Sequence, residues 1–267
     1  MSTSDGVDLD PPGRILRKPV ADQVDAPQHL HGFGGLHGGF ALALLGSVMR
    51  THASGLELRS ISATFGRPIR SGFHVTSGLA RSGRTTRTVT AAAESDAAKH
   101  IEASAVFGAA GVPPSPVVTA SAPAAPAPEE CEPLVIPREF LPISTSMEIR
   151  PVGPGRPYAG GDEPELTAWV RLTEDDDPPD VLRFVFLMDA LAPSYTAILS
   201  TLVLVPTVEL TVRPAAGLSG AHSPWVLVRA RTVSADSGGW VDETMDAWDP
   251  DGTHLGSGHQ LRVVRQG

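Results

Sequence analysis

The chain has 267 residues, 41% apolar and 19% charged, which is enough for one large domain or two small ones. Its 30 acidic and 21 basic residues give a net charge of −9, which argues against a nucleic-acid binder with a basic surface. The single cysteine, Cys131, excludes an internal disulfide and a thiolate zinc cluster, and no apolar run reaches the ~18–20 residues that span a bilayer.

The first part of the chain is predicted to be a disordered tail followed by one helix and four strands. Residues 1–13 are polar and lack the basic and apolar regions of a signal peptide, so we expect a tail and a cytoplasmic protein. A Gly-rich segment at 32–39 precedes the apolar run 40–49, which predicts a buried helix. Strand-like segments at 58–65, 73–79, 85–92 and 100–107 complete a unit over 14–108.

A Pro-rich segment separates this unit from a second one of the same kind. Residues 109–130 are almost all Ala, Pro, Ser and Val, and their X-Pro steps predict a linker. In the unit 131–267, a strand precedes a long apolar stretch that we interpret as a helix, and Asp251-Gly252 predicts a hairpin turn. These elements are the strand 166–172, the helix 181–200 and the strands 205–212, 226–233, 240–248 and 255–264. Two copies of one α+β unit are therefore expected.

Three polar residues stand out in apolar surroundings of the second unit. Asp189, in FVFLMDALAP, is predicted to lie mid-helix, where a carboxylate is either a satisfied structural group or a catalytic base. Gln260 is aligned with the apolar Val106 of the first unit, so only one copy carries an amide there. Thr207 is expected to share a strand face with Glu209 and Thr211, and alone it would be an ordinary strand residue.

Two further segments could bind a ligand. Histidines 29, 31 and 37 match no common metal-ligand spacing, so no metal is expected, whereas Gly38 and Gly39 would let backbone N–H groups at a helix N-terminus approach a carbonyl or phosphate. An arginine cluster either covers a solvated strand face or holds the phosphates of an anionic substrate, with Arg84 the leading candidate. The cluster consists of Arg67, Arg70, Arg81, Arg84 and Arg87.

Seven short motifs occur in a fixed order along the chain. They are FGGLHGG, TFGRP and ARSGR in the first unit, and AWVR, LMDALAP, TVE and DGTHLGSGHQ in the second. In this order they resemble the double-hotdog acyl-CoA thioesterase II family, over nearly the whole chain apart from the tail and the linker. The resemblance implies an α+β double hotdog, with two tandem units that each wrap an antiparallel sheet around a long helix.

The resemblance also implies an enzyme of lipid metabolism that hydrolyses acyl-CoA to free fatty acid and CoA without a metal or cofactor. The family's Asp, Thr and Gln, which activate a water molecule, fall on Asp189, Thr207 and Gln260. His37, Gly38, Gly39 and Arg84 are expected to bind the substrate, with an N–H of Gly38 or Gly39 meeting the oxyanion. A homo-oligomer is expected, because sheet edges tend to pair.

Some residues depart from the family pattern. Glu209 replaces the usual Asp, Leu261-Arg262 replaces Glu-Gly, and Gly46 stands where single-hotdog thioesterases often place a catalytic Asp. The first unit is therefore expected to lack a site of its own. Two alternatives stay open. One is a non-catalytic acyl-CoA-binding protein. The other is an enoyl-CoA hydratase-type hotdog, which the absence of a His five residues after Asp189 disfavours.

Overall fold

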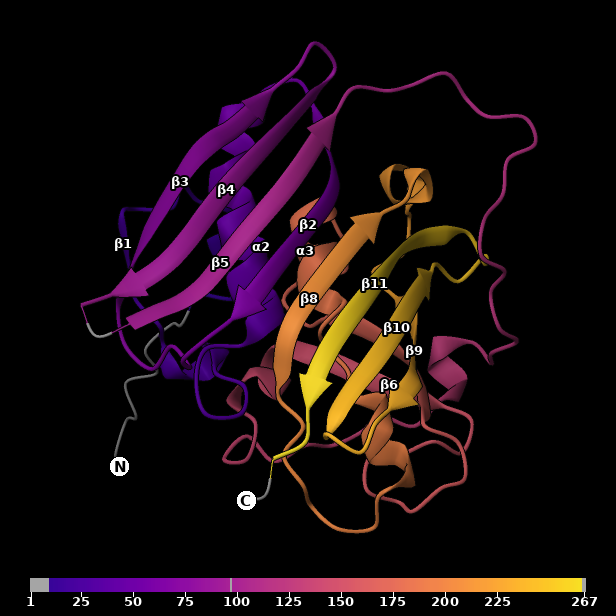
Figure 1. Cartoon of the computed structure of the whole chain (residues 1–267). Coiled ribbons are helices and arrows are strands. Elements are labelled where there is room, and N and C mark those ends of the chain that lie inside the picture. Colours follow the sequence, from indigo (N-terminus) through magenta and orange to yellow (C-terminus); the bar gives the residue numbers. More distant parts are fainter. Residues whose placement is uncertain (1–9, 97, 266–267) are drawn as a thin grey trace, which may run out of the picture.

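The computed structural model describes residues 10–96 and 98–265, in which eleven strands form one antiparallel sheet (Figure 1). The strand order is β1-β3-β4-β5-β2-β8-β11-β10-β9-β7-β6. The first half contributes α1 (Pro12–Arg17), β1 (Gln23–Val24), α2 (Gly38–Arg50), β2 (Glu57–Phe65), β3 (Phe73–Ser82), β4 (Thr86–Ser95) and β5 (Ala98–Gly108). The second contributes β6 (Met147–Val152), β7 (Glu165–Leu172), α3 (Val181–Leu187), β8 (Thr207–Pro214), β9 (Val226–Ala235), β10 (Trp240–Trp248) and β11 (His254–Val263).

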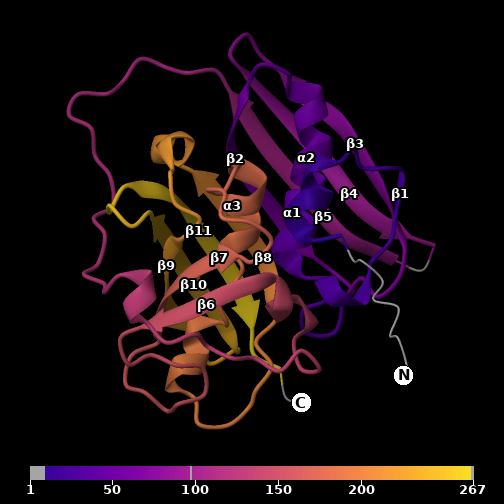
Figure 2. The same cartoon turned by 180° about the vertical axis from the view of Figure 1, so that it is seen from behind.

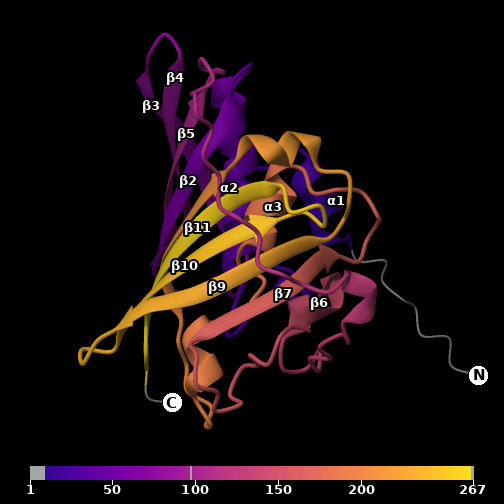
Figure 3. The same ribbon diagram turned by 90° about the vertical axis from the view of Figure 1, so that its right-hand side faces the viewer.

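The two halves repeat one topology, which confirms the predicted pair of α+β units. In each half a helix is followed by a strand, here β2 or β8, and then by a three-stranded meander that returns to pair with that strand. Strands β2 and β8 pair with each other and join the halves into one sheet. The sheet is strongly curved, and α2 and α3 lie together on its inner side (Figures 2 and 3).

Helix α2 is buried on nearly all sides because it packs between the sheet and α3. Its residues from Gly39 to Gly46 are buried, in agreement with the apolar run in the sequence. Their side chains join those of α3 and of both halves of the sheet in one continuous core. The N-terminus of α2 is thereby held against the second half of the chain.

The long helix predicted over 181–200 is wrong. Helix α3 ends at Leu187, a turn follows, and a separate 3₁₀ turn covers Ser194–Ile198. Pro193 has no N–H to continue a helix, and its ring disfavours helical backbone in the residue before it. The amides of Asp189 and Ala190 instead bond to carbonyls three residues back, at 3.1 Å each, so Asp189 lies in a turn beyond the helix.

The N-terminal boundary also differs from the expectation. The tail was predicted over 1–13, but Pro12 and Gly13 belong to α1, and the Gly13 amide donates to Glu174 Oε2 at 3.0 Å. The rest of the predicted tail, residues 1–9, lies outside the described residues. No helix among the described residues is long and apolar enough to cross a membrane.

The Pro-rich segment 109–127 has no helix or strand, yet its second part packs on the sheet. Trp169, Leu227 and Trp248 project from the outer face of β7, β9 and β10, opposite the core. Ala120, Ala122 and Ala125 lie against this tryptophan cluster. The indole N–H groups of Trp169 and Trp248 donate to Pro126 and Ala120 carbonyls at 2.9 and 3.0 Å, so the segment is a cover.

Replacing residues 118–126 with a Gly/Ser segment of equal length is expected to lower Tm by about 5 °C or more. The change removes the Ala and Pro side chains that cover the tryptophans, and a flexible Gly/Ser backbone no longer holds the two carbonyls against the indoles. An unpaired buried donor costs about 1–3 kcal/mol. Tryptophan emission should shift to the red because the indoles become hydrated. The same replacement at the exposed residues 110–114 is the control. Equal melting curves and emission spectra for the two variants would contradict a covering role.

Candidate active site

Asp189 projects from the turn after α3 toward the N-terminus of α2. Its side chain is 12% exposed, and its Oδ2 accepts a hydrogen bond from the Gly39 amide at 2.7 Å. The first turn of a helix carries unpaired N–H groups and partial positive charge, so it stabilises a carboxylate. The carboxylate of the second half is thus bound by the helix of the first half.

Gln260 and Thr207 continue from Asp189 as a chain of hydrogen bonds. Gln260 is fully buried on β11, and its Nε2 donates to Asp189 Oδ1 at 3.1 Å. The Thr207 hydroxyl, at the start of β8, donates to Gln260 Oε1 at 2.7 Å. The three polar residues singled out in the second half therefore meet in one place.

Thr207 reaches this position through a β-bulge, and the predicted strand face was wrong. Leu261 pairs with Glu209, but the next residue, Arg262, pairs with Thr207, so Val208 is the extra residue of the bulge. The bulge turns Thr207 to the inner face of the sheet, toward Gln260. Glu209 stays on the outer face, where it lines a groove.

The alignment of Gln260 with Val106 was wrong by one residue. Val106 is 38% exposed on the outer face of β5, whereas Gln260 points inward. The inward positions of β5 in this stretch are Ala103 and Ala105, which are both buried. Side chains alternate between faces along a strand, so a shift of one residue exchanges a core position for a surface position.

Gly38 and Gly39 let α2 approach Asp189 closely. A Cβ on Gly39 would lie 2.5 Å from Asp189 Cβ and 2.8 Å from the Phe186 carbonyl oxygen, and one on Gly38 would lie 3.1 Å from Asp189 Oδ2. An N–H of Gly38 or Gly39 was expected to bind the substrate oxyanion. The Gly39 amide already donates to Asp189, so it is not available for that role. The Gly38 amide has no partner among the described residues and keeps that possibility.

His37 caps α2 beside the carboxylate. Its Nδ1 accepts a 3.4 Å hydrogen bond from the Phe40 amide and lies 3.8 Å from Asp189 Oδ2. Burial lowers the pKa of His37, an effect that the nearby Asp189 opposes and Arg262 supports. The ring is therefore neutral at pH 7, with its proton on Nε2 because Nδ1 is the acceptor.

The lowered pKa of His37 predicts that acid destabilises the protein through this residue. Below pH 6.5 the unfolded chain binds a proton at His37, whereas the folded chain does not bind it until a lower pH. The free energy of unfolding therefore falls as the pH falls from 6.5 toward the pKa of His37 in the folded chain. His37→Asn keeps a capping acceptor and removes the titration. The loss of Tm between pH 7.5 and pH 5.5 should be smaller in this variant than in wild type. Equal losses would show that His37 does not titrate in this window.

Arg84 lies away from Asp189. It occupies the tip of the β3–β4 hairpin, beyond the C-terminal end of α2, whereas Asp189 contacts the N-terminal end (Figure 1). Arg67 and Arg70 precede β3 and Arg81 is near its end, so the five arginines do not form one patch. Arg70 bonds the Gly34 carbonyl and Arg87 bonds the His52 carbonyl. Phosphate binding by Arg84 stays a prediction.

Within residues 10–96 and 98–108, the first half has no equivalent of the Asp189 site. Gly46 approaches Leu182, the second residue of α3, much as Asp189 approaches Gly39, the second residue of α2. A Cβ on Gly46 would lie 3.2 Å from Leu182 Cδ2 and 3.1 Å from Ile61 Cδ1. Apolar packing thus fills the position that corresponds to the carboxylate.

Arg262 and Glu243 were missed as members of the site. They form a buried ion pair, 4% and 0% exposed, and Arg262 Nη1 donates to the Thr207 hydroxyl at 2.8 Å. In the sequence, Arg262 stands out only as a departure from the family motif. The available signal was strand alternation, which puts both charged residues on the inner faces of apolar strands.

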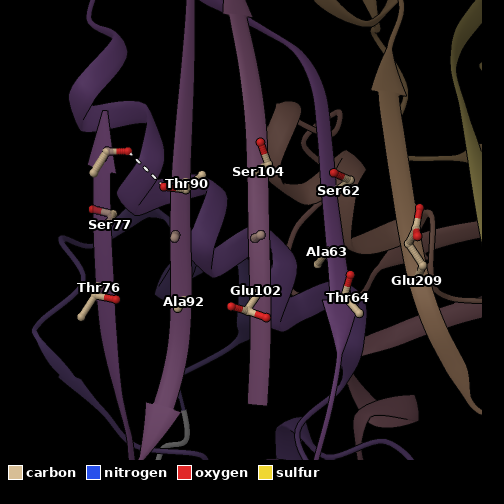
Figure 4. Close-up of a pocket in the computed structure, with 13 residues that line it drawn as sticks. Ser62, Ala63, Thr64, Thr76, Ser77, Thr90, Ala92, Glu102, Ser104 and Glu209 are labelled. Carbon is tan, nitrogen blue, oxygen red and sulfur yellow. Dashed lines mark hydrogen bonds between the residues drawn. The ribbon is translucent and has the colours of Figure 1, made fainter. Parts of the chain in front are cut away.

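A groove on the outer face of the sheet is separate from this site (Figure 4). Ser62, Thr64, Glu102, Ser104 and Glu209 line it, on the side of the sheet away from α2. Among the described residues, no group of three or more His, Cys, Asp or Glu side chains could hold a metal ion. The chemistry considered below rests on Asp189 and its partners.

Two family models match the chain. The model described as acyl-CoA thioesterase N-terminal domain matches residues 26–108, and the one described as acyl-CoA thioesterase C-terminal domain matches residues 128–264. No curated protein matches the chain at a significant level.

Solved structures share the fold over nearly the whole chain. A hot dog fold protein of unknown function from Alicyclobacillus acidocaldarius is 22% identical with a TM-score of 0.83, over 92% of this chain and 93% of that one. A protein assigned as thioesterase II from Thermobifida fusca is 23% identical with a TM-score of 0.78, over 91% and 92%. Acyl-CoA thioesterase II TesB2 from Mycobacterium marinum is 18% identical with a TM-score of 0.72, over 95% and 97%.

Proposed function

The chain belongs to the acyl-CoA thioesterase family and has its double hotdog fold, and from this premise we propose that it hydrolyses acyl-CoA to a free fatty acid and CoA. The observation that carries the proposal is the Asp189 carboxylate, which is bound by the Gly39 amide and the Gln260 amide at the N-terminus of α2. A carboxylate held in this way, and still 12% exposed, can reach a water molecule.

In the proposed reaction Asp189 is the general base. It takes a proton from water as the water oxygen bonds to the thioester carbonyl carbon. The carbonyl oxygen becomes an oxyanion, and in this proposal the Gly38 N–H at the start of α2 donates a hydrogen bond to it. When the carbonyl reforms, the C–S bond breaks and its electron pair leaves with the CoA thiolate, to which the proton is finally transferred.

Gln260 and Thr207 have positioning roles in this proposal. Gln260 holds Asp189 Oδ1 and is itself held by the Thr207 hydroxyl, so the carboxylate has one orientation. Side-chain groups fixed in this way before the substrate arrives need no reorganisation during the reaction. His37, neutral and in contact range of Asp189, can offer its Nε2–H to the substrate.

The contact between His37 and Asp189 supports a second candidate, the addition of water to an enoyl-CoA. An imidazole and a carboxylate 3.8 Å apart, from different halves of the chain, are an acid–base pair of the kind that hydration requires. The Nδ1 acceptor role of His37 toward Phe40 leaves only Nε2 for such chemistry. A third candidate is acyl-CoA binding without turnover.

Incubation with saturated acyl-CoAs of several lengths and with a 2-enoyl-CoA separates the three candidates. Hydrolysis yields free acid and an equal amount of thiol from the saturated substrates. Hydration yields a 3-hydroxyacyl-CoA with no thiol release, and a binding protein leaves both substrates intact. Product masses and thiol titration identify the outcome. We expect thiol and free acid, and their absence with every saturated acyl-CoA would overturn the proposal.

The cytoplasmic location and the homo-oligomer stay part of the proposal. Strands β1 and β6 are the two edges of the sheet, and unpaired edges favour association. Sedimentation of the purified protein tests the oligomer directly.

A further inference from the structure

A chain of polar contacts continues behind Thr207 into the second half of the protein. Arg262 Nε and Nη2 bond Glu243 Oε1 at 3.1 and 3.0 Å, and the other carboxylate oxygen of Glu243 accepts from the Ser194 amide. The remaining guanidinium arm of Arg262 reaches Thr207 Oγ1 at 2.8 Å. Glu243 therefore holds two guanidinium nitrogens and leaves the third for the threonine.

Each hydrogen bond from Arg262 to Asp189 has a defined direction in the structure. A guanidinium only donates, so Thr207 must accept from Arg262, and the proton of Thr207 goes to Gln260 Oε1. The side-chain oxygen of Gln260 then faces Thr207, and its NH₂ group faces Asp189. A Gln260 amide rotated by half a turn would leave the Thr207 proton without this acceptor and would place the amide oxygen against the carboxylate.

We propose that Arg262, clamped by Glu243, is a positioning residue that keeps the Gln260 amide donating to Asp189 during the reaction. This inference rests on the proposed function. The resting carboxylate alone favours the same orientation of Gln260. Once Asp189 has taken the proton from water, one of its oxygens can donate a hydrogen bond. The protonated carboxyl group then favours the NH₂ side of Gln260 less strongly than the carboxylate does. Arg262 still donates to Thr207, so the Thr207 proton stays available to Gln260 Oε1 and favours the same amide orientation.

The double variant Arg262→Gln/Glu243→Gln removes this control with little other change. The glutamine at 262 ends where Arg262 Nε now contacts Glu243, so it can bond the amide at 243 but cannot reach Thr207. The amide at 243 keeps an acceptor for Ser194, and no unpaired buried charge is left. Single removal of either partner would leave such a charge and is not informative.

A double-mutant cycle with Thr207→Val separates positioning from a structural role. With Thr207 present, the two substitutions should lower kcat about 10- to 100-fold and change KM less than twofold. A small misplacement of a catalytic group reduces the reaction rate by about this factor. In the Thr207→Val background they should lower kcat less than twofold, since Arg262 acts through the hydroxyl. Equal losses in both backgrounds, or a wild-type kcat in the double variant, would overturn the proposal.

A measurement without substrate keeps this test apart from the test of hydrolysis. In Asp189→Asn protein labelled with ¹⁵N at glutamine side chains, residue 189 carries no charge that could hold the Gln260 amide by itself. In this background the Gln260 NH₂ signals should change when the substitutions Arg262→Gln and Glu243→Gln are added. Unchanged signals would overturn positioning even if wild type hydrolyses acyl-CoA. Absence of wild-type turnover with the expected change in signals would overturn only the proposed function. If the double variant melts far below wild type, Arg262→Met/Glu243→Gln, which also removes the donor to Thr207 and leaves no buried charge, replaces it with the same expectations.

Discussion

Replacing Asp189 with asparagine is expected to lower kcat at least ~10²-fold, the lower end of the contribution of a general base. Asparagine has the same shape but cannot take a proton from water. Its NH₂ group also faces either the Gly39 amide or the Gln260 amide, both of which donate. One donor is then left unpaired, at about 1–3 kcal/mol, so the variant should melt a few degrees lower and stay folded.

Asp249→Asn is the matched control for this experiment. Asp249 is 3% exposed, and its Oδ1 accepts from the amides of Asp251 and Thr253 in the hairpin before β11, far from Gln260 along the strand. Its replacement should affect stability and leave kcat unchanged. Thiol release and melting curves are measured on both variants. Near-wild-type turnover in folded Asp189→Asn would remove this carboxylate from the mechanism.

Gly39→Ala is expected to abolish most activity, whereas Gly46→Ala in the same helix is expected to be tolerated. The new methyl at 39 would lie 2.5 Å from Asp189 Cβ and 2.8 Å from a backbone oxygen, so α2 must move away from α3. Such overpacking costs about 1–3 kcal/mol. The movement also breaks the hydrogen bond to Asp189, so kcat should fall ~10²-fold or more, as with the loss of a precisely placed group.

At position 46 the nearest atoms are the ends of flexible side chains, Ile61 Cδ1 at 3.1 Å and Leu182 Cδ2 at 3.2 Å. They can shift slightly, and alanine favours a helix over glycine by about 0.8–1.0 kcal/mol. Melting curves and kcat for the two variants provide the comparison. A Gly39→Ala protein that turns over like Gly46→Ala would show that contact between α2 and Asp189 is not needed.

The repeat and the buried helix α2 could be predicted because both depend on local patterns. The apolar run at 40–49 and the alternation in the strands are visible in single segments, and the same order of elements occurs twice. The cover over Trp169 and Trp248 could not be predicted, because a Pro-rich segment gives no indication of which surface it meets. The five arginines looked like a cluster only because they are close in sequence.

The errors near the site have two physical sources. One is the exact alternation of strands, where the bulge at Val208 or a shift of one residue at Val106 moves a side chain to the other face. The other is contact between distant segments. The identity of Asp189 as a candidate came from its apolar neighbours, but its binding by Gly39 joins residues from different halves. The role inferred for Arg262 likewise depends on contacts across three strands.

Hydrolysis of acyl-CoA by the wild-type chain in ¹⁸O-labelled water tests the proposed reaction. We expect equal amounts of CoA thiol and free acid, with one ¹⁸O atom in the acid from each turnover, since water bonds directly to the acyl carbon. A folded chain that binds acyl-CoA and leaves the thioester intact would contradict this expectation.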